Sequence, residues 1–176
     1  MSKTLGNVID PMDMISVYGT DALRYYCLAK ISPFADGDFS EEKLKEAYNA
    51  DLANGLGNLV ARVARLVELK GYVESAEKPE TFSEEVKASL EKYLFNEALM
   101  AIWKRITELD VIINQEKPWS WTTLDDHGKK IFETLVKGIA QIAFDLQPFM
   151  PETAEKILTQ YTAEKITATQ PLFPRL

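Results

Sequence analysis

The chain has 176 residues, 46% of them hydrophobic, and a formal net charge of −7, which suits one folded domain with or without a small appendage. One cysteine and one histidine exclude a disulfide framework and a Cys/His zinc centre, and they argue against Ser/His or Cys/His catalysis. An acidic chain is not expected to coat DNA or an anionic membrane, although it can carry a local basic site. Its short apolar stretches and polar N-terminus predict neither a membrane span nor secretion, so we expect a cytoplasmic protein.

Residues 1–39 are rich in Gly, Pro and Asp and predict short helices separated by turns. Asp10 and the following proline form a typical helix start, and Gly19 ends that helix. Thr20 or Asp21 is expected to cap a second helix that runs through about residue 29.

Residues 40–161 are expected to be almost entirely helical. Ser40 can cap a long helix that Gly71 ends, because glycine accepts the left-handed conformation that follows many helices. Apolar residues along it recur at three- and four-residue spacing and predict one buried stripe: Leu44, Tyr48, Leu52, Leu56, Leu59, Val63 and Leu66. Gly55 and Gly57 weaken this helix by about 1 kcal/mol each, so we expect a neighbouring element to pack closely against them.

After a loop at 72–82, a capping box at Thr81 and Glu84, or a cap at Ser83, begins a helix that runs to about residue 93. A turn near 94–96 separates it from the most regular stripe of the chain, which consists of Phe95, Leu99, Ile102, Ile106, Leu109 and Ile113. Pro118 ends that helix region.

A helix over about 125–147 follows, with Phe132, Leu135, Ile139, Ile142 and Leu146 facing inward. Two prolines then bracket a bend before a short helix that ends near Tyr161. The tail 162–176 has no helical pattern and can contain an extended segment. Short connections between amphipathic helices predict an all-α, antiparallel helical bundle at 40–176, preceded by a linking segment at 1–39.

The first candidate site is the N-terminal loop, whose small polar residues and one lysine suit an anionic phosphate. The run from Met1 to Pro11 resembles the KMSKS loop of class I aminoacyl-tRNA synthetases, and the run from Tyr18 to Tyr26 resembles the segment on the C-terminal side of that loop in the same class. Several later stretches resemble methionyl-tRNA synthetases in particular, in the same order along the chain: residues 36–40, 49–54, 57–62, 95–99, 117–119 and 148–154.

The resemblance implies a C-terminal fragment of a ligase that joins methionine to its tRNA using ATP. Lys3 would stabilise the pyrophosphate leaving group, with Ser2 and Thr4 orienting the loop or contacting ATP. Thr4 stands where the family has serine and keeps the hydroxyl. The chain begins inside the loop and lacks the Rossmann catalytic domain and the zinc-bearing insertion, so we expect the fragment to be inactive alone and to contain no metal.

The second candidate site is a helix face that carries Asn58 and Arg62, at positions i and i+4, beside the apolar stripe. Asparagine can donate to and accept from a base edge, and the arginine fork can bind a base or a phosphate. The alternative to a binding site is an ordinary solvent-exposed face, on which Arg62 forms an ion pair with Glu68 or another acid. The resemblance favours recognition of the tRNA anticodon by Asn58 and Arg62.

Trp119 is the third candidate, because it follows a proline at a helix end and lies outside the apolar period. It matches the tryptophan on which the family stacks an anticodon base, and Asn114 and Lys117 nearby could assist. Trp103 and Trp121 are expected to have structural roles.

Arg62 and Trp119 can meet only if their two long helices run parallel, with residues 83–93 running back between them. Cys27 is expected in the core and His127 on the surface. Two alternatives remain open: the corresponding part of a cysteinyl, leucyl or valyl enzyme, and a helical bundle that binds protein partners and no RNA.

Overall fold

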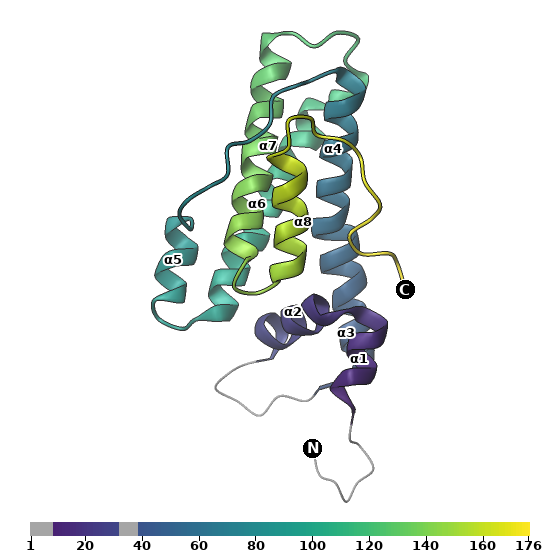
Figure 1. Cartoon of the computed structure of the whole chain (residues 1–176), viewed down its shortest axis with the longest axis vertical. Coiled ribbons are helices and arrows are strands. Elements are labelled where there is room, and N and C mark those ends of the chain that lie inside the picture. Colours follow the sequence, from purple (N-terminus) through teal and green to yellow (C-terminus); the bar gives the residue numbers. More distant parts are fainter. Residues whose placement is uncertain (1–8, 32–38) are drawn as a thin grey trace, which may run out of the picture.

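The structure, a computed structural model, describes residues 9–31 and 39–176, and all regular elements within those ranges are helical. The predicted all-α fold is therefore confirmed. The elements are α1 (Pro11–Tyr18), α2 (Thr20–Lys30), α3 (Glu41–Ala47), the π-helix η2 (Tyr48–Gly57), α4 (Asn58–Lys70), α5 (Glu84–Leu90), α6 (Phe95–Glu116), the 3₁₀ turn η3 (Pro118–Ser120), α7 (Asp126–Leu146) and α8 (Pro151–Tyr161). Figure 1 shows α4, α6, α7 and α8 side by side, with α1 and α2 across one end of the bundle.

One continuous helical rod runs from α3 through η2 into α4, as the apolar stripe predicts. Ser40 caps its start, since its hydroxyl oxygen accepts the backbone N–H of Lys43. Gly71 ends the rod with a φ of 68°, the left-handed conformation that favours glycine. The π-helical stretch of ten residues in the middle was not predicted, because its buried residues Tyr48, Leu52 and Leu56 keep the four-residue spacing that an α-helix also shows.

The C-terminal tail lies across this π-helix. The ring of Phe173 packs at Gly57, where an added Cβ atom would lie 3.4 Å from the ring and 3.0 Å from a backbone oxygen. The side-chain amide of Asn49 donates to the carbonyl oxygen of Leu176 and accepts its backbone N–H, both at 3.3 Å. The close packing expected at Gly57 is confirmed, and the tail is an irregular segment fixed by these contacts, without a strand.

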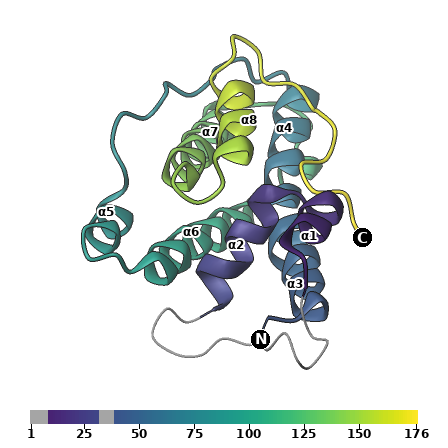
Figure 2. The same cartoon turned by 60° about the horizontal axis from the view of Figure 1, so that its bottom comes forward.

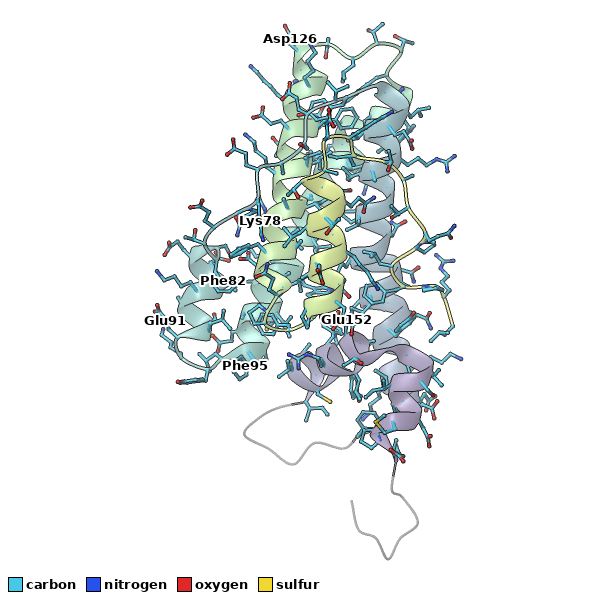
Figure 3. All side chains as sticks on the ribbon, in the orientation of Figure 1. Lys78, Phe82, Glu91, Phe95, Asp126 and Glu152 are labelled. Atoms are coloured by element: carbon cyan, nitrogen blue, oxygen red, sulfur yellow. The ribbon has the colours of Figure 1, made fainter. Side chains whose placement is uncertain are left out.

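The chain returns between α4 and α6 through the loop 71–83 and α5, so α4 and α6 run in the same direction (Figure 1). The predicted turn before α6 is confirmed, and Tyr93 adopts a φ of 58° within it. The expectation that residues 83–93 lie between the long helices is wrong, because α5 packs on the outer side of α6 (Figure 2). With one buried residue, Val86, α5 cannot fill an inner position. The return loop is held by Phe82, whose ring lies 5.3 Å from that of Phe144 on α7 (Figure 3).

The core forms around α7, which packs against α6, α4 and α8. All five residues predicted to face inward from this helix are buried, as are the members of the α6 stripe after Phe95. Phe95 itself is 37% exposed because it lies at the first turn of α6. Gly138 permits the close approach of α6 and α7, since an added Cβ atom would lie 2.9 Å from two methyl carbons of Leu109.

Two expectations for α2 are wrong. Gly19, with a φ of 83°, precedes the helix without a side-chain cap, and Thr20 is already its first residue. Asp21 points away from its own helix start and is buried against α8. Cys27 is exposed, because α2 presents Ala22 and two tyrosines to the bundle and leaves the cysteine on the outer face.

Contacts from α2 hold the linking segment on the end of the bundle. A carboxylate oxygen of Asp21 accepts the backbone N–H of Thr153 at 2.7 Å, which caps the start of α8. Arg24 donates to the carbonyl oxygens of Pro148 at 2.8 Å and Phe149 at 2.7 Å, in the bend before α8. Because burial and the nearby Asp51 raise the pKa of Tyr25 well above its usual range, this phenol stays protonated and donates to Asp51 at 2.9 Å. Residues far apart in the sequence are thereby joined in one junction.

Asp21→Ala is expected to lower the free energy of unfolding by about 1–3 kcal/mol, because it leaves a buried N–H at the start of α8 without its acceptor. Thermal and urea unfolding followed by circular dichroism would measure the change. Asp13→Ala, in the exposed first turn of α1, is the control and should change stability by less than about 0.5 kcal/mol. Equal effects of the two substitutions would contradict the capping role.

Candidate functional site

The far end of the bundle from α1 and α2 brings together two residues that the sequence places 57 positions apart. Arg62 is on the second turn of α4, and Trp119 is in η3, directly after α6. The guanidinium carbon of Arg62 lies 5.0 Å from the centre of the Trp119 ring, a cation–π contact. The parallel direction required of the two long helices is therefore confirmed, although residues 83–93 do not lie between them.

The orientation of Arg62 is set by α6 as well as by the indole. Its Nη1 donates to Asp110 at 3.2 Å and its Nη2 donates to the side-chain oxygen of Asn114 at 3.0 Å. The arginine side chain is 27% exposed, which agrees with a position beside the core stripe. The expected pairing with an acid exists, but it crosses to α6 and does not involve Glu68. The guanidinium is thus held at three points before any ligand arrives.

Trp119 offers an aromatic surface to solvent. The residue is 47% exposed, and the Arg62 guanidinium lies over its ring. The preceding Pro118 is buried and fixes the start of the turn. An exposed indole that rests on a charged group and projects from a single turn is suited to stack against a planar ligand.

The other two tryptophans have structural roles, as predicted. Trp121 donates through Nε1 to the backbone oxygen of Glu116 at 3.0 Å, and its ring packs against that of Phe132 at 5.5 Å. Trp103 stacks on Tyr25 at 4.4 Å, in contact with α2. Both rings are partly buried against the core, whereas Trp119 is not.

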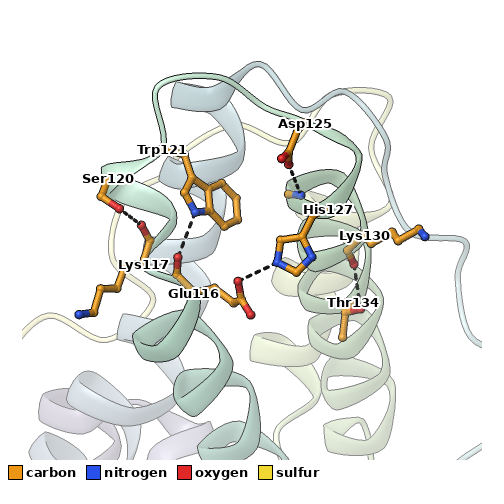
Figure 4. A network of polar contacts seen from close by, with 9 residues as sticks. Glu116, Lys117, Ser120, Trp121, Asp125, His127, Lys130 and Thr134 are labelled. Carbon is orange, nitrogen blue, oxygen red and sulfur yellow. Dashed lines mark hydrogen bonds and ion pairs between the residues drawn. The ribbon is translucent and has the colours of Figure 1, made fainter.

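Polar contacts fix the connection between α6 and α7 (Figure 4). Glu116, at the end of α6, binds the imidazole of His127 at 2.9 Å. Asp125 caps α7 by accepting the backbone N–H of Gly128 at 2.8 Å. His127 is exposed, which confirms the surface position predicted for it. The segment that carries Trp119 therefore has a defined path over the end of the bundle.

The other residues predicted for the site differ in their relation to the Arg62–Trp119 contact. Asn58 is the first residue of α4, exposed and one turn before Arg62 on the same face. Asn114 is engaged with Arg62, and Lys117 is exposed in the left-handed conformation after α6, with a φ of 48°. The loop residues Ser2, Lys3 and Thr4 lie outside the residues that the structure describes.

Sequence reasoning missed two residues of this centre. Asp110 precedes Asn114 by one turn on α6, and this spacing is a signal that could have indicated a polar pair facing α4. Lys70 donates to the carbonyl oxygen of Trp119 at 3.5 Å and to that of Trp121. A lysine in the last turn of a helix is so common that its position gave no specific signal.

Cations and acids both lie at this end of the bundle. Arg62 and Arg65 follow each other along one face of α4, and Lys70 and Lys117 lie at the same end. Asp110 offsets part of this charge. In a chain with a net charge of −7, these cations are groups at this end that can attract an anionic ligand.

Within residues 9–31 and 39–176, no group of His, Cys, Asp and Glu has the arrangement of a metal site. None of the helices in the described part of the chain is long and apolar enough to cross a bilayer.

Comparisons with known proteins cover both parts of the chain. The family described as class I (M) tRNA synthetases matches residues 1–64, and the family described as the anticodon-binding domain of tRNA ligases matches residues 77–175. The methionine–tRNA ligase of Fusobacterium nucleatum is 37% identical over 94% of this chain, and that of Clostridium acetobutylicum is 36% identical over 93%. The chain spans 28% of the length of each of these relatives.

Two solved structures have a similar fold. The Mycobacterium tuberculosis methionyl-tRNA synthetase in complex with methionyl-adenylate matches 99% of this chain with a TM-score of 0.77 and 26% identity. The apo form from the same organism matches 96% of the chain with a TM-score of 0.79 and 23% identity. In each case the match covers 41% of the solved chain.

Proposed function

Because the chain belongs to the family of tRNA-ligase anticodon-binding domains and is homologous to the C-terminal region of methionyl-tRNA synthetases, we propose that it binds the anticodon loop of methionine tRNA. The observation that carries this proposal is the contact of Arg62 with the exposed ring of Trp119. An exposed aromatic ring beside a guanidinium is an arrangement that supports the binding of one unpaired nucleotide.

Recognition then depends on the chemistry of three side chains. A base that is released from the stacked loop rests on the open surface of Trp119, since any base has a π face. The Arg62 fork and the Asn58 amide bind base edges, and these hydrogen bonds distinguish one anticodon from another. The guanidinium is already oriented by Asp110 and Asn114, so little of its freedom is lost on binding.

For the whole protein, we propose methionine–tRNA ligation with ATP in the cytoplasm, carried out with a catalytic domain that this chain does not include. Residues 1–39 are assigned to the loop and linking segment, and 40–176 to the anticodon-binding domain. Lys3 would stabilise the developing charge on pyrophosphate, with Ser2 and Thr4 beside it in contact with ATP, because a cation contributes most where charge appears in the transition state. This chain alone is expected to form no methionyl-adenylate.

A titration of this chain with methionine tRNA and with a version of altered anticodon tests the proposal. We expect weak but measurable binding that prefers the native anticodon, because contacts from the missing catalytic domain are absent. Equal affinity for the two RNAs, or no binding at millimolar concentration, would favour the alternative of a bundle that binds protein partners. The matched relatives support the methionyl enzyme over the cysteinyl, leucyl and valyl enzymes.

A further inference from the structure

Lys70 connects the helix that carries Arg62 with the turn that carries Trp119. It lies in the last turn of α4, and its ammonium donates to the carbonyl oxygens of Trp119 and Trp121. A helix of a single turn has no internal partners for its last carbonyl groups, and a nearby cation satisfies them. Lys70 therefore satisfies the carbonyl groups at the end of η3 from the side of α4.

Apart from the guanidinium of Arg62, which lies over the Trp119 ring, the other contacts of this turn are hydrogen bonds within the turn or toward α6. The backbone N–H of Ser120 donates to Lys117 at 2.9 Å, and that of Trp121 donates to Pro118 at 3.4 Å. The Trp121 indole binds the end of α6 through the Glu116 carbonyl oxygen. These bonds set the shape of the turn, but they do not set its distance from α4.

We propose that Lys70 is a positioning residue of the anticodon site, which holds the backbone of Trp119 where its indole meets Arg62. The inference rests on the proposed function, because its effect on binding exists only if Trp119 stacks a base. Both carbonyl groups that Lys70 binds belong to the segment on which Trp119 stands, and the lysine is half-buried there. Lys70 thus acts through the indole and not by contact with RNA.

Removal of the ammonium takes away the hydrogen bonds between α4 and the backbone of this turn and leaves the Arg62 contact as the link to α4. The indole is then less ordered before RNA binds, and its ordering lowers the affinity. Ordering one such side chain at an interface lowers affinity by about 2- to 10-fold, which is the loss expected for Lys70→Met. Methionine keeps much of the length and apolar stem of lysine but cannot donate to the carbonyl groups. Lys70→Arg keeps the charge and the donors, so it should restore most of the affinity.

The first test needs no RNA. The chain is labelled with 5-fluorotryptophan, and its three ¹⁹F signals are assigned with Trp→Phe variants at positions 103, 119 and 121. In Lys70→Met we expect the Trp119 signal to shift or broaden while the Trp103 signal stays in place. Lys104→Met, on the exposed face of α6, is the matched control and should leave all three signals unchanged. An unchanged Trp119 signal in folded Lys70→Met would overturn the inference.

The second test separates positioning from a phosphate contact. Lys70→Met and Trp119→Ala are combined, and we expect the double variant to bind methionine tRNA about as weakly as Trp119→Ala alone. The slope of log Kd against log salt concentration should not change. An additive loss, with a slope reduced by about 0.7, would show that Lys70 binds a phosphate of the RNA directly. If the wild-type chain shows no anticodon preference, the proposed function fails, while the fluorine signals still decide the role of Lys70.

Discussion

Trp119→Ala is expected to raise the Kd for methionine tRNA about 5- to 150-fold. Stacking of one unpaired base on an aromatic ring contributes about 1–3 kcal/mol, and this substitution removes the whole stacking surface. The free energy of unfolding should change little, because nearly half of Trp119 is exposed. Fluorescence anisotropy with labelled tRNA, together with thermal unfolding of the same samples, measures both quantities.

Two other tryptophans provide the comparison. Trp103→Phe keeps an aromatic ring against Tyr25 near the opposite end of the bundle and should leave the Kd unchanged. Trp121→Ala is expected to lower the melting temperature, since it loses a buried contact with Phe132 and the bond to the end of α6, and to weaken binding by the folded protein less than Trp119→Ala does. Comparable losses of affinity for Trp119→Ala and Trp121→Ala would show that Trp119 is not the stacking surface.

Arg62→Ala has the second large expected effect, a rise in Kd of about 10- to 150-fold. Hydrogen bonds to a charged group contribute about 1.5–3 kcal/mol, and the loss of the guanidinium also leaves Asp110 unpaired beside the RNA. Arg62→Lys should restore little, because an ammonium lacks the planar fork that binds Asp110, Asn114 and a base edge together. The same titration measures the Kd of both variants.

The ratio of affinities for native and altered anticodons shows whether Arg62 binds a base edge or a phosphate. If it binds a base edge, Arg62→Ala lowers the ratio of affinities for native and altered anticodons and leaves the salt dependence almost unchanged. A uniform loss with a reduced salt slope would assign Arg62 to a phosphate instead. Arg105→Ala is the control, because it removes an equal charge from α6, where Arg105 pairs with Glu108 and not with a residue of the candidate site. It should change the Kd for both RNAs very little.

The bundle separates the candidate site from the linking segment formed by α1 and α2. The rod formed by α3, η2 and α4 covers residues 41–70, about 45 Å at the α-helical rise of 1.5 Å per residue. The candidate site is near its far end, and the linking segment is fixed at its near end by Asp21 and Arg24 (Figure 1). In the proposed function, this rigid spacing lets the identity of the tRNA be read far from the chemistry on its other end.

Several features could be predicted from the sequence because they depend on neighbours along the chain. The stripes of α6 and α7 repeat with the period of an α-helix, and this fixes which residues are buried. Caps such as Asp10 and Ser40 bind backbone groups two or three residues away, so they can be predicted from local pattern. The resemblance also indicated Arg62 and Trp119 as candidate residues that meet at one end of the bundle, although not that the guanidinium lies over the indole ring.

Other features depended on which elements meet in space. Asp21 caps a helix that begins 130 residues later, and Cys27 is exposed because of the side on which α2 meets the bundle. Arg62 is held by Asp110 on a helix that became its neighbour only through the return at 71–83. Periodicity assigns a residue to a face but does not say which helix covers that face. Local pattern and family resemblance therefore sufficed to predict the helices, their inner faces and the family, whereas the partners of Arg62, Trp119 and Lys70 depend on how the helices pack against one another.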